Sequence, residues 1–276
     1  MDDPHRVEED AVCVFDVFVP QDIRDEHYPD TNFGYQTFVV RRGLQHFDGA
    51  TALKYARSRK TTSDYDRARR QQDLALAIRQ KIESNGLVEN TQRLREFYDL
   101  FRRKVNTDID LTTLLALTKI GMGIDYGDIV SAVLNDDPTQ RGGLLYAPAR
   151  EFYNGQFVLL PQSMADTQAF LDLVLIHPEI LLENAQIAVL NGTSEEGLAS
   201  KTAAQLRRLG FHVIEVSNYE TVTGNDVAVT FLEESPTAQT PGTKEFLEQF
   251  FDISIAKTAE DISSDSLIDL RLVLGQ

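Results

Sequence analysis

The chain of 276 residues has little cysteine and no long apolar run, and each shortage excludes a class of protein. Its one cysteine, Cys13, cannot form an intramolecular disulfide, and its five scattered histidines show no zinc-ligand spacing. No stretch approaches the roughly 20 apolar residues of a membrane helix. The first ten residues, MDDPHRVEED, are acidic, unlike the start of a signal peptide. The sequence as written therefore predicts a soluble chain.

Positive charge is also scarce, because 27 lysines and arginines stand against 43 aspartates and glutamates, which gives a net charge of -16. Such a surface does not attract nucleic acid or an anionic membrane, so neither is expected as a partner. Hydrophobic residues make up 42% and charged residues 25%, as in an ordinary globular protein. An anionic ligand would therefore have to bind at a local exception to this charge.

The length favours two compact domains, and Pro178 with the hinge after it predicts a boundary near residue 180. In residues 1–180 we expect a mixed sheet flanked by helices. The expected strands are 12–19, which would bury Cys13, then 35–40 and a short one near 157–160. Between the first two, QDIRDEHYPDTNFG is expected to be a polar loop.

The expected helices of this part have recognisable ends. Asp48 is a predicted N-cap for a short helix that ends near Arg57. Ser63 or Asp64 can cap a longer helix over about 65–82, with Asn85-Gly86 as its stop. Further helices are predicted in REFYDLFRRKV, LTTLLALTKIGM and MADTQAFLDLVLIH.

Residues 181–276 alternate short strands with two helices. This order predicts a small α/β sandwich of the split-βαβ type. The strands are expected at 186–190, 212–216, 227–233, 253–256 and 267–274, and the helices at 198–209 and 244–251.

One short segment reverses the charge of the chain. Within RSRKTTSDYDRARRQ, residues 57–71, six cations stand against two acids. At helical spacing, Arg67, Arg70, Gln71, Leu74 and Ile78 share one stripe whose second half is apolar, so the stripe is expected to face the core. Arg69 points away from it.

Arginines on an inward stripe require an anion, because burying an unpaired guanidinium costs several kcal/mol. Phosphate fits best, since two or three planar guanidinium groups can surround one phosphoryl group near a helix N-terminus. Asp64 would then fix an arginine or bind Mg²⁺. The alternative is a solvated helix face in which Asp64 and Asp66 cap the helix and pair with the arginines.

The segment GLQHFDGATALKYARSRKTTSDYDRARRQQ resembles the signature of the LytR-CpsA-Psr family. The resemblance implies an enzyme on the outer face of the cell membrane. It would transfer a polyprenyl-pyrophosphate-linked glycopolymer, such as teichoic acid or capsule, to peptidoglycan. It also implies an apolar pocket for the lipid, which LTTLLALTKIGM and the strands before Pro20 are candidates to line.

The resemblance also assigns roles to residues. The residues that would hold the pyrophosphate are Arg57, Arg59, Arg67 and Gln71, with Arg70 as the second helix arginine. Asp64 would orient them or approach Mg²⁺, the cofactor that the family implies. Transfer would proceed by positioning and charge neutralisation.

A second resemblance covers QIAVLNGTSEEGLASKTAAQLRRLGFHVIEV and the terminal LRLVLG, which look like the accessory domain that often follows this catalytic domain. The first match starts about halfway into the catalytic domain, without the membrane helix and the Pro-Arg-Asp motif of the family. We therefore expect a truncated gene product, a split gene or a recombinant fragment that shows no turnover of polyprenyl pyrophosphate by itself. A non-catalytic envelope-binding module and a transcription attenuator are the alternative functions.

Overall fold

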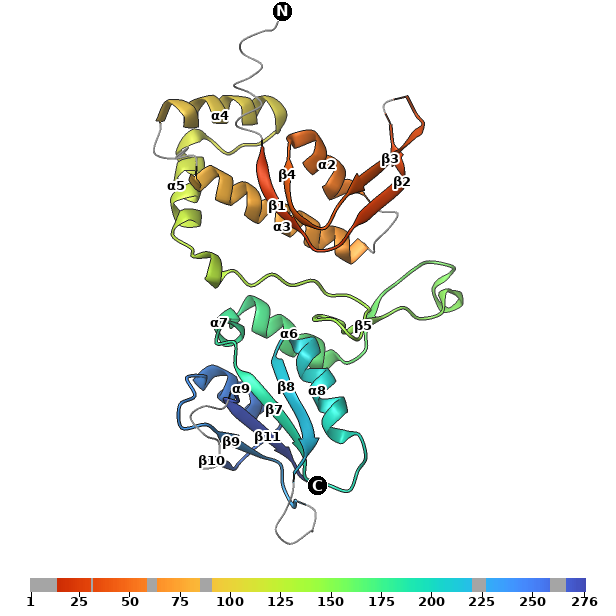
Figure 1. The fold of residues 1–276 in the computed structure, drawn as a ribbon, viewed down its shortest axis with the longest axis vertical. Helices are drawn as coiled ribbons and strands as arrows, with labels where there is room; N and C mark the ends of the chain where they lie inside the picture. Colours follow the sequence, from red (N-terminus) through yellow and green to blue (C-terminus); the bar gives the residue numbers. More distant parts are fainter. Residues whose placement is uncertain (1–13, 31, 59–63, 85–90, 220–226, 259–266) are drawn as a thin grey trace, which may run out of the picture. The chain divides into compact units, whose positions relative to one another are not determined.

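The computed structural model describes residues 14–30, 32–58, 64–84, 91–219, 227–258 and 267–276. It divides into two compact units, Met1–Tyr126 and Gly127–Gln276, called here the first and the second unit (Figure 1). Cys13, Arg59 and the predicted stop at Asn85-Gly86 lie outside the described residues, and so does the side chain of Asp64. No helix in the described ranges is both long and apolar enough to cross a membrane.

Two antiparallel strand pairs form the sheet layer of the first unit. They are β1 with β4 and β2 with β3, where the bounds are β1 Phe15–Val19, β2 Ile23–Pro29, β3 Tyr35–Val40 and β4 Gly43–Phe47. Alternate residues of β1 point inward, and Phe15 pairs in register with Phe47 of β4. Their side chains join a core with Val17, Val19 and Tyr55, and the predicted strand 35–40 is confirmed.

The predicted polar loop before Tyr35 is wrong over residues 23–29, which form β2. Ile23, Asp25 and Tyr28 point inward, and the register with β3 shifts between Asp25 and Tyr28. A bulge adds a residue between two inward positions, so the strand lacks a period of two. The inward carboxylate of Asp25 is also a residue type that is more usual in a loop than at a buried strand position.

The described part of the first unit contains four α-helices, and the first of them begins where its predicted cap places it. They are α2 Gly49–Arg57, α3 Asp64–Ser84, α4 Thr91–Lys104 and α5 Leu111–Met122, followed by the 3₁₀ helix η1 Tyr126–Asp128. Asp48 caps α2, because its Oδ1 accepts a hydrogen bond of 2.7 Å from the backbone N–H of Thr51. None of the residues of α5 is buried, and Ile120 is 65% exposed, so α5 is not ordinary core.

The stripe predicted to bury one face of α3 is confirmed at Arg70 and Leu74 and wrong at two other positions. Arg70, Leu74 and Ala77 are buried, whereas Gln71 is exposed and Ile78 is 45% exposed. Helix α3 packs mainly on α2 and β1, so its contact face is narrow and follows the spacing i, i+4, i+7. The prediction that Gln71 and Ile78 face the core is therefore wrong.

Short elements precede the main sheet of the second unit. They are β5 Leu145–Tyr146, the 3₁₀ helix η2 Arg150–Tyr153, β6 Leu160–Pro161, α6 Met164–Leu175 and α7 Pro178–Leu182. Helix α6 packs on the core of this unit through Phe170 and Leu173. Its Asp166 accepts a hydrogen bond of 2.8 Å from Gln205 of α8 (Leu198–Leu209).

A five-stranded mixed sheet organises the second unit, in the order β10-β9-β11-β7-β8. The bounds are β7 Gln186–Asn191, β8 His212–Asn218, β9 Phe231–Glu234, β10 Ala256–Thr258 and β11 Leu270–Leu274, with helix α9 at Pro241–Phe250. In the β7-α8-β8 motif and in the β9-α9-β10 motif the two strands are parallel neighbours in the sheet. Strand β11 lies between β9 and β7.

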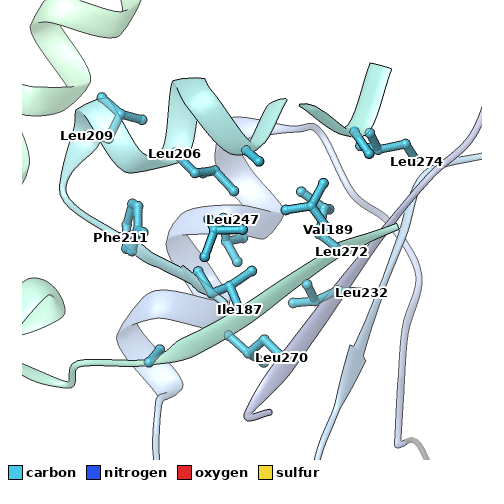
Figure 2. Packing of buried hydrophobic residues seen from close by; sticks show 14 of the residues in the cluster. Ile187, Val189, Leu206, Leu209, Phe211, Leu232, Leu247, Leu270, Leu272 and Leu274 are labelled. Atoms are coloured by element: carbon cyan, nitrogen blue, oxygen red, sulfur yellow. The ribbon is translucent and has the colours of Figure 1, made fainter. Parts of the chain in front are cut away.

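The core between the sheet and its helices is almost entirely aliphatic (Figure 2). Ile187, Leu232 and Leu272 from three strands meet Leu206 of α8 and Leu247 of α9, and all five are fully buried. The predicted α/β class is confirmed, with a mixed sheet and helices packed on it. The division after Tyr126 separates two compact parts of the structure. The domain boundary near residue 180 stays a prediction.

The cap of α2 gives a pH-dependent prediction. Hydrogen bonds from the Thr51 side chain and backbone lower the pKa of Asp48 below its ordinary value of 3.8. The cap therefore stabilises the fold fully above that ordinary value, and its contribution is lost as the pH falls through the lower, folded pKa. We expect Asp48→Ala to reduce the free energy of unfolding by about 1 kcal/mol at neutral pH and by less near pH ~3.

Urea denaturation at both pH values measures this difference. Asp48→Asn is the matched control, because an amide caps equally well without a titrating group. An unchanged stability of Asp48→Ala at neutral pH would show that the cap contributes nothing.

Candidate functional site

The cation-rich segment lies where α2 ends and α3 begins. Arg57 is the last residue of α2 and its side chain is exposed, and Arg67 is half-buried in the first two turns of α3. Arg59 and Lys60 stand between the two helices, in the part of the chain that the structure does not describe. The segment therefore places cations on both sides of one helix-helix connection.

Arg70 is the most deeply buried of the cations that the structure describes in this segment. It is 4% exposed, its Nε donates to the carbonyl oxygen of Tyr55 at 3.1 Å, and its Nη2 donates to that of Ser58 at 2.5 Å. Both carbonyl groups belong to the C-terminal end of α2, where a cation is favoured by the helix dipole. Burial lowers the pKa of Arg70 from its ordinary value, and nearby Tyr55 and Asp25 oppose that change. Arg70 thus ties α3 to the end of α2.

A buried carboxylate from β2 completes this arrangement. Asp25 is 2% exposed, and its Oδ2 accepts a hydrogen bond of 2.9 Å from the hydroxyl group of Ser58. Its Oδ1 accepts one of 3.1 Å from the backbone N–H of His27. Asp25, Ser58 and Arg70 therefore form a buried polar network that joins β2, α2 and α3.

Sequence reasoning missed Asp25 and Ser58. The only signal for Asp25 was its position two residues after an apolar Ile23, which the bulge in β2 obscures. Ser58 received no role from the sequence pattern. Neither residue type is diagnostic of burial by itself.

The remaining residues of the segment make lighter contacts. Gln71 is exposed, but its Nε2 donates to the carbonyl oxygen of Ala56 at 3.3 Å. Arg69 lies 3.8 Å from Asp66, which matches the ion pair expected of a solvated helix face. The structure thus brings Arg70 and Gln71 to carbonyl groups at the end of α2, near Arg57. The roles of all the predicted site residues in ligand binding stay predictions.

Tyr55 provides the floor of this region. It is fully buried, the guanidinium of Arg70 lies 5.6 Å from its ring centroid, and its ring packs on Phe47 at 5.1 Å. Burial raises the pKa of Tyr55 to about 12, so the phenol stays protonated at physiological pH. Among the described residues its hydroxyl group has no hydrogen-bond partner. Tyr55 therefore acts as a neutral, aromatic support for Arg70.

A cavity of about 370 Å³ opens between β1 and α3. It is lined by residues 16–18 and Pro20 on the strand side and by Asp73, Leu76, Ala77 and Gln80 on the helix side. Desolvation raises the pKa of Asp73, although its side chain is still partly open to water. The strand before Pro20 therefore does line a cavity, whereas α5 does not contribute to this one.

The predicted magnesium site cannot be placed from these residues. Within the described ranges, no three carboxylate, histidine or cysteine side chains gather in a group that could hold a metal ion. Because the side chain of Asp64 lies outside those ranges, its role toward Mg²⁺ stays a prediction.

The chemistry available at the connection between α2 and α3 is anion binding. Guanidinium groups on a framework held by Arg70 can donate pairs of charge-assisted hydrogen bonds to phosphoryl oxygens. The rest of the chain is acidic overall, so few other cations would compete with these groups for an anion.

Comparisons with known proteins agree with the two-part sequence pattern. The LytR_cpsA_psr family model matches residues 10–153, and the model described as LytR cell envelope-related transcriptional attenuator matches residues 184–276. The chain is 27% identical over 197 residues to the cell wall biosynthesis protein LcpA of Corynebacterium glutamicum. That match covers 64% of the chain and 35% of LcpA, and no solved structure matches the chain significantly. The chain belongs to the LytR-CpsA-Psr family.

Proposed function

We propose that residues 57–71 form the pyrophosphate-binding part of an envelope phosphotransferase that attaches glycopolymers to peptidoglycan. The observation that carries the proposal is the pair of hydrogen bonds by which Arg70 joins the end of α2 to the start of α3. On this framework the neighbouring cations would share one anion. The family match and the similarity to the cell wall biosynthesis protein LcpA support an envelope role.

In the proposed reaction the ligand is a polyprenyl pyrophosphate that carries the glycopolymer. A peptidoglycan hydroxyl group attacks the phosphorus atom next to the sugar and gives its proton to water. The bond from that phosphorus to the bridging oxygen breaks, and polyprenyl phosphate leaves with the electron pair. Arg57, Arg59 and Arg67 would stabilise the negative charge that develops on the leaving phosphate.

Arg70 and Gln71 have a different part in this proposal. Arg70 donates to the carbonyl groups of Tyr55 and Ser58, and Gln71 donates to that of Ala56. We assign them the positioning of the α2 end, in addition to the pyrophosphate contact that the family resemblance implies. A metal ion at Asp64 would supply further charge neutralisation when bound.

Farnesyl pyrophosphate, a short polyprenyl pyrophosphate, tests the proposal on the chain as it exists. We expect calorimetric binding that weakens about tenfold in Arg57→Ala and in Arg67→Ala, because each loses a charge-assisted contact. Arg103→Ala is the matched control, since Arg103 is an exposed arginine on α4, away from the segment. Equal weakening in all three variants would exclude the segment as the site, and so would equal affinity for farnesol.

A further inference from the structure

A groove of about 590 Å³ runs between helices α6, α7 and α9 of the second unit. One wall comes from the end of α6 and from α7, including Asp172, Ile176 and Ile180. The other wall is one face of α9. From Gly242 to Phe250 this face extends about 12 Å at the rise of an α-helix, so the groove is long enough for two turns of a second helix.

The floor of the groove is apolar and aromatic. Phe246 and Phe250 stand one turn apart on α9 and stack with ring centroids 5.3 Å apart. Phe246 also packs on Phe211 at 5.1 Å, which anchors the pair to the core. Opposite them, Ile176 is 63% exposed. Covering an apolar surface of this kind with another apolar group is energetically favourable.

The rim of the groove is negative. Asp172, Glu179 and Glu245 line it, and no lysine or arginine is among the described residues of the lining. The hydrogen-bond partners of Asp172 and Glu245 are the neutral amides of Gln168 and Gln249, which leave the charge uncompensated.

Other titratable groups near the groove do not reverse this charge. His177 lies 3.0 Å from Glu179 and is the one basic side chain of the lining. On α9, Lys244 is held by Glu234 of β9 at 2.6 Å, so it is directed to the sheet.

The two walls are held at a fixed distance by Glu183, which follows α7. Its Oε1 accepts a hydrogen bond from the backbone N–H of Gly242, and its Oε2 accepts one from that of Thr243, both at 2.7 Å. Oε2 also accepts one of 2.6 Å from the Thr243 hydroxyl group. Glu183 thus caps α9 from the neighbouring helix, which occupies the helix N-terminus and preorganises the groove.

We propose that this groove binds a basic amphipathic helix of a partner protein. Leucine-like side chains at i, i+3 and i+4 would cover Phe246, Phe250 and Ile176, and lysines or arginines would meet the carboxylates of the rim. Charge complementarity selects this occupant, because an acidic or anionic-lipid partner would be repelled. The inference concerns the second unit alone and does not depend on the proposed phosphotransferase function.

Methyl NMR on the whole chain tests the proposal, because Ile176 and Ile180 line the groove and report on it directly. The probe is a blocked peptide of about 18 residues with leucines on one helical face and lysines elsewhere. We expect it to shift the methyl signals of both isoleucines. A shuffled peptide of the same composition should bind about tenfold more weakly, since its leucines share no face.

Matched variants separate the groove from general charge attraction. Glu245→Lys should weaken binding about tenfold, and Glu196→Lys, at an exposed acid outside the groove, less than about twofold. Ile176→Gln should also weaken binding, whereas Leu175→Gln, at a neighbour 73% exposed and outside the lining, should not. Equal binding of the two peptides, or equal loss in the two lysine variants, would overturn the proposal. Spermidine shifting the same signals with equal affinity would overturn it too.

Discussion

Replacing Arg70 by methionine should reduce the free energy of unfolding of the first unit by about 3 kcal/mol, since two buried carbonyl groups lose their donors. Methionine keeps most of the aliphatic volume, so the loss reports the hydrogen bonds and not a cavity. Ser58 is 1% exposed and Tyr55 is 0% exposed, so the carbonyl groups that accept from Arg70 have no access to water. Urea denaturation followed by the methyl signal of Ile23, buried in the same core, measures the change.

Arg69→Met is the matched control for this change. Arg69 lies on the same helix, but it makes a partly exposed ion pair with Asp66 at 3.8 Å. Such pairs contribute at most about 1 kcal/mol. Equal destabilisation by the two variants would show that the carbonyl contacts of Arg70 do not hold α2 and α3 together.

The same comparison bears on the proposed function. If Arg70 positions the end of α2, Arg70→Lys should weaken the binding of farnesyl pyrophosphate even though it keeps the charge. A lysine ammonium is a single point donor and cannot reproduce the fork that reaches two carbonyl groups. Unchanged affinity in Arg70→Lys would limit Arg70 to a contribution of charge.

Local signals predicted the helices of this chain well. Asp48 as an N-cap depends only on the few residues around it, so its effect can be read from a short stretch. The core strand 186–190 could be predicted equally well, because its apolar run is continuous and buried on both faces.

The missed features depend on contacts distant in the sequence. Asp25 is buried because Ser58, 33 residues later, donates to it, and no local pattern contains that pairing. The buried face of α3 is set by which elements lie under it, so spacing alone wrongly added Gln71 and Ile78 to that face. Glu183 likewise caps α9 from 59 residues away. Polar networks of this kind become visible only in three dimensions.

In the second unit, Leu247→Ala should reduce the free energy of unfolding by about 3 kcal/mol, the usual cost of a cavity in a rigid aliphatic core. Leu247 is fully buried on α9 and belongs to the same core as Ile187, Leu232 and Leu272 (Figure 2). These residues come from three different strands, so the surroundings cannot collapse into the space without moving the sheet. Urea denaturation followed by the methyl signal of Ile187 measures the loss.

Leu267→Ala is the corresponding control, because Leu267 is 80% exposed and its truncation leaves no cavity. Its effect should stay within about 0.5 kcal/mol. Since α9 also forms one wall of the groove, a destabilised Leu247→Ala protein that still binds the leucine and lysine peptide below its unfolding transition would show that the wall survives. A stability loss in Leu247→Ala no larger than that in Leu267→Ala would mean that α9 does not pack into this core.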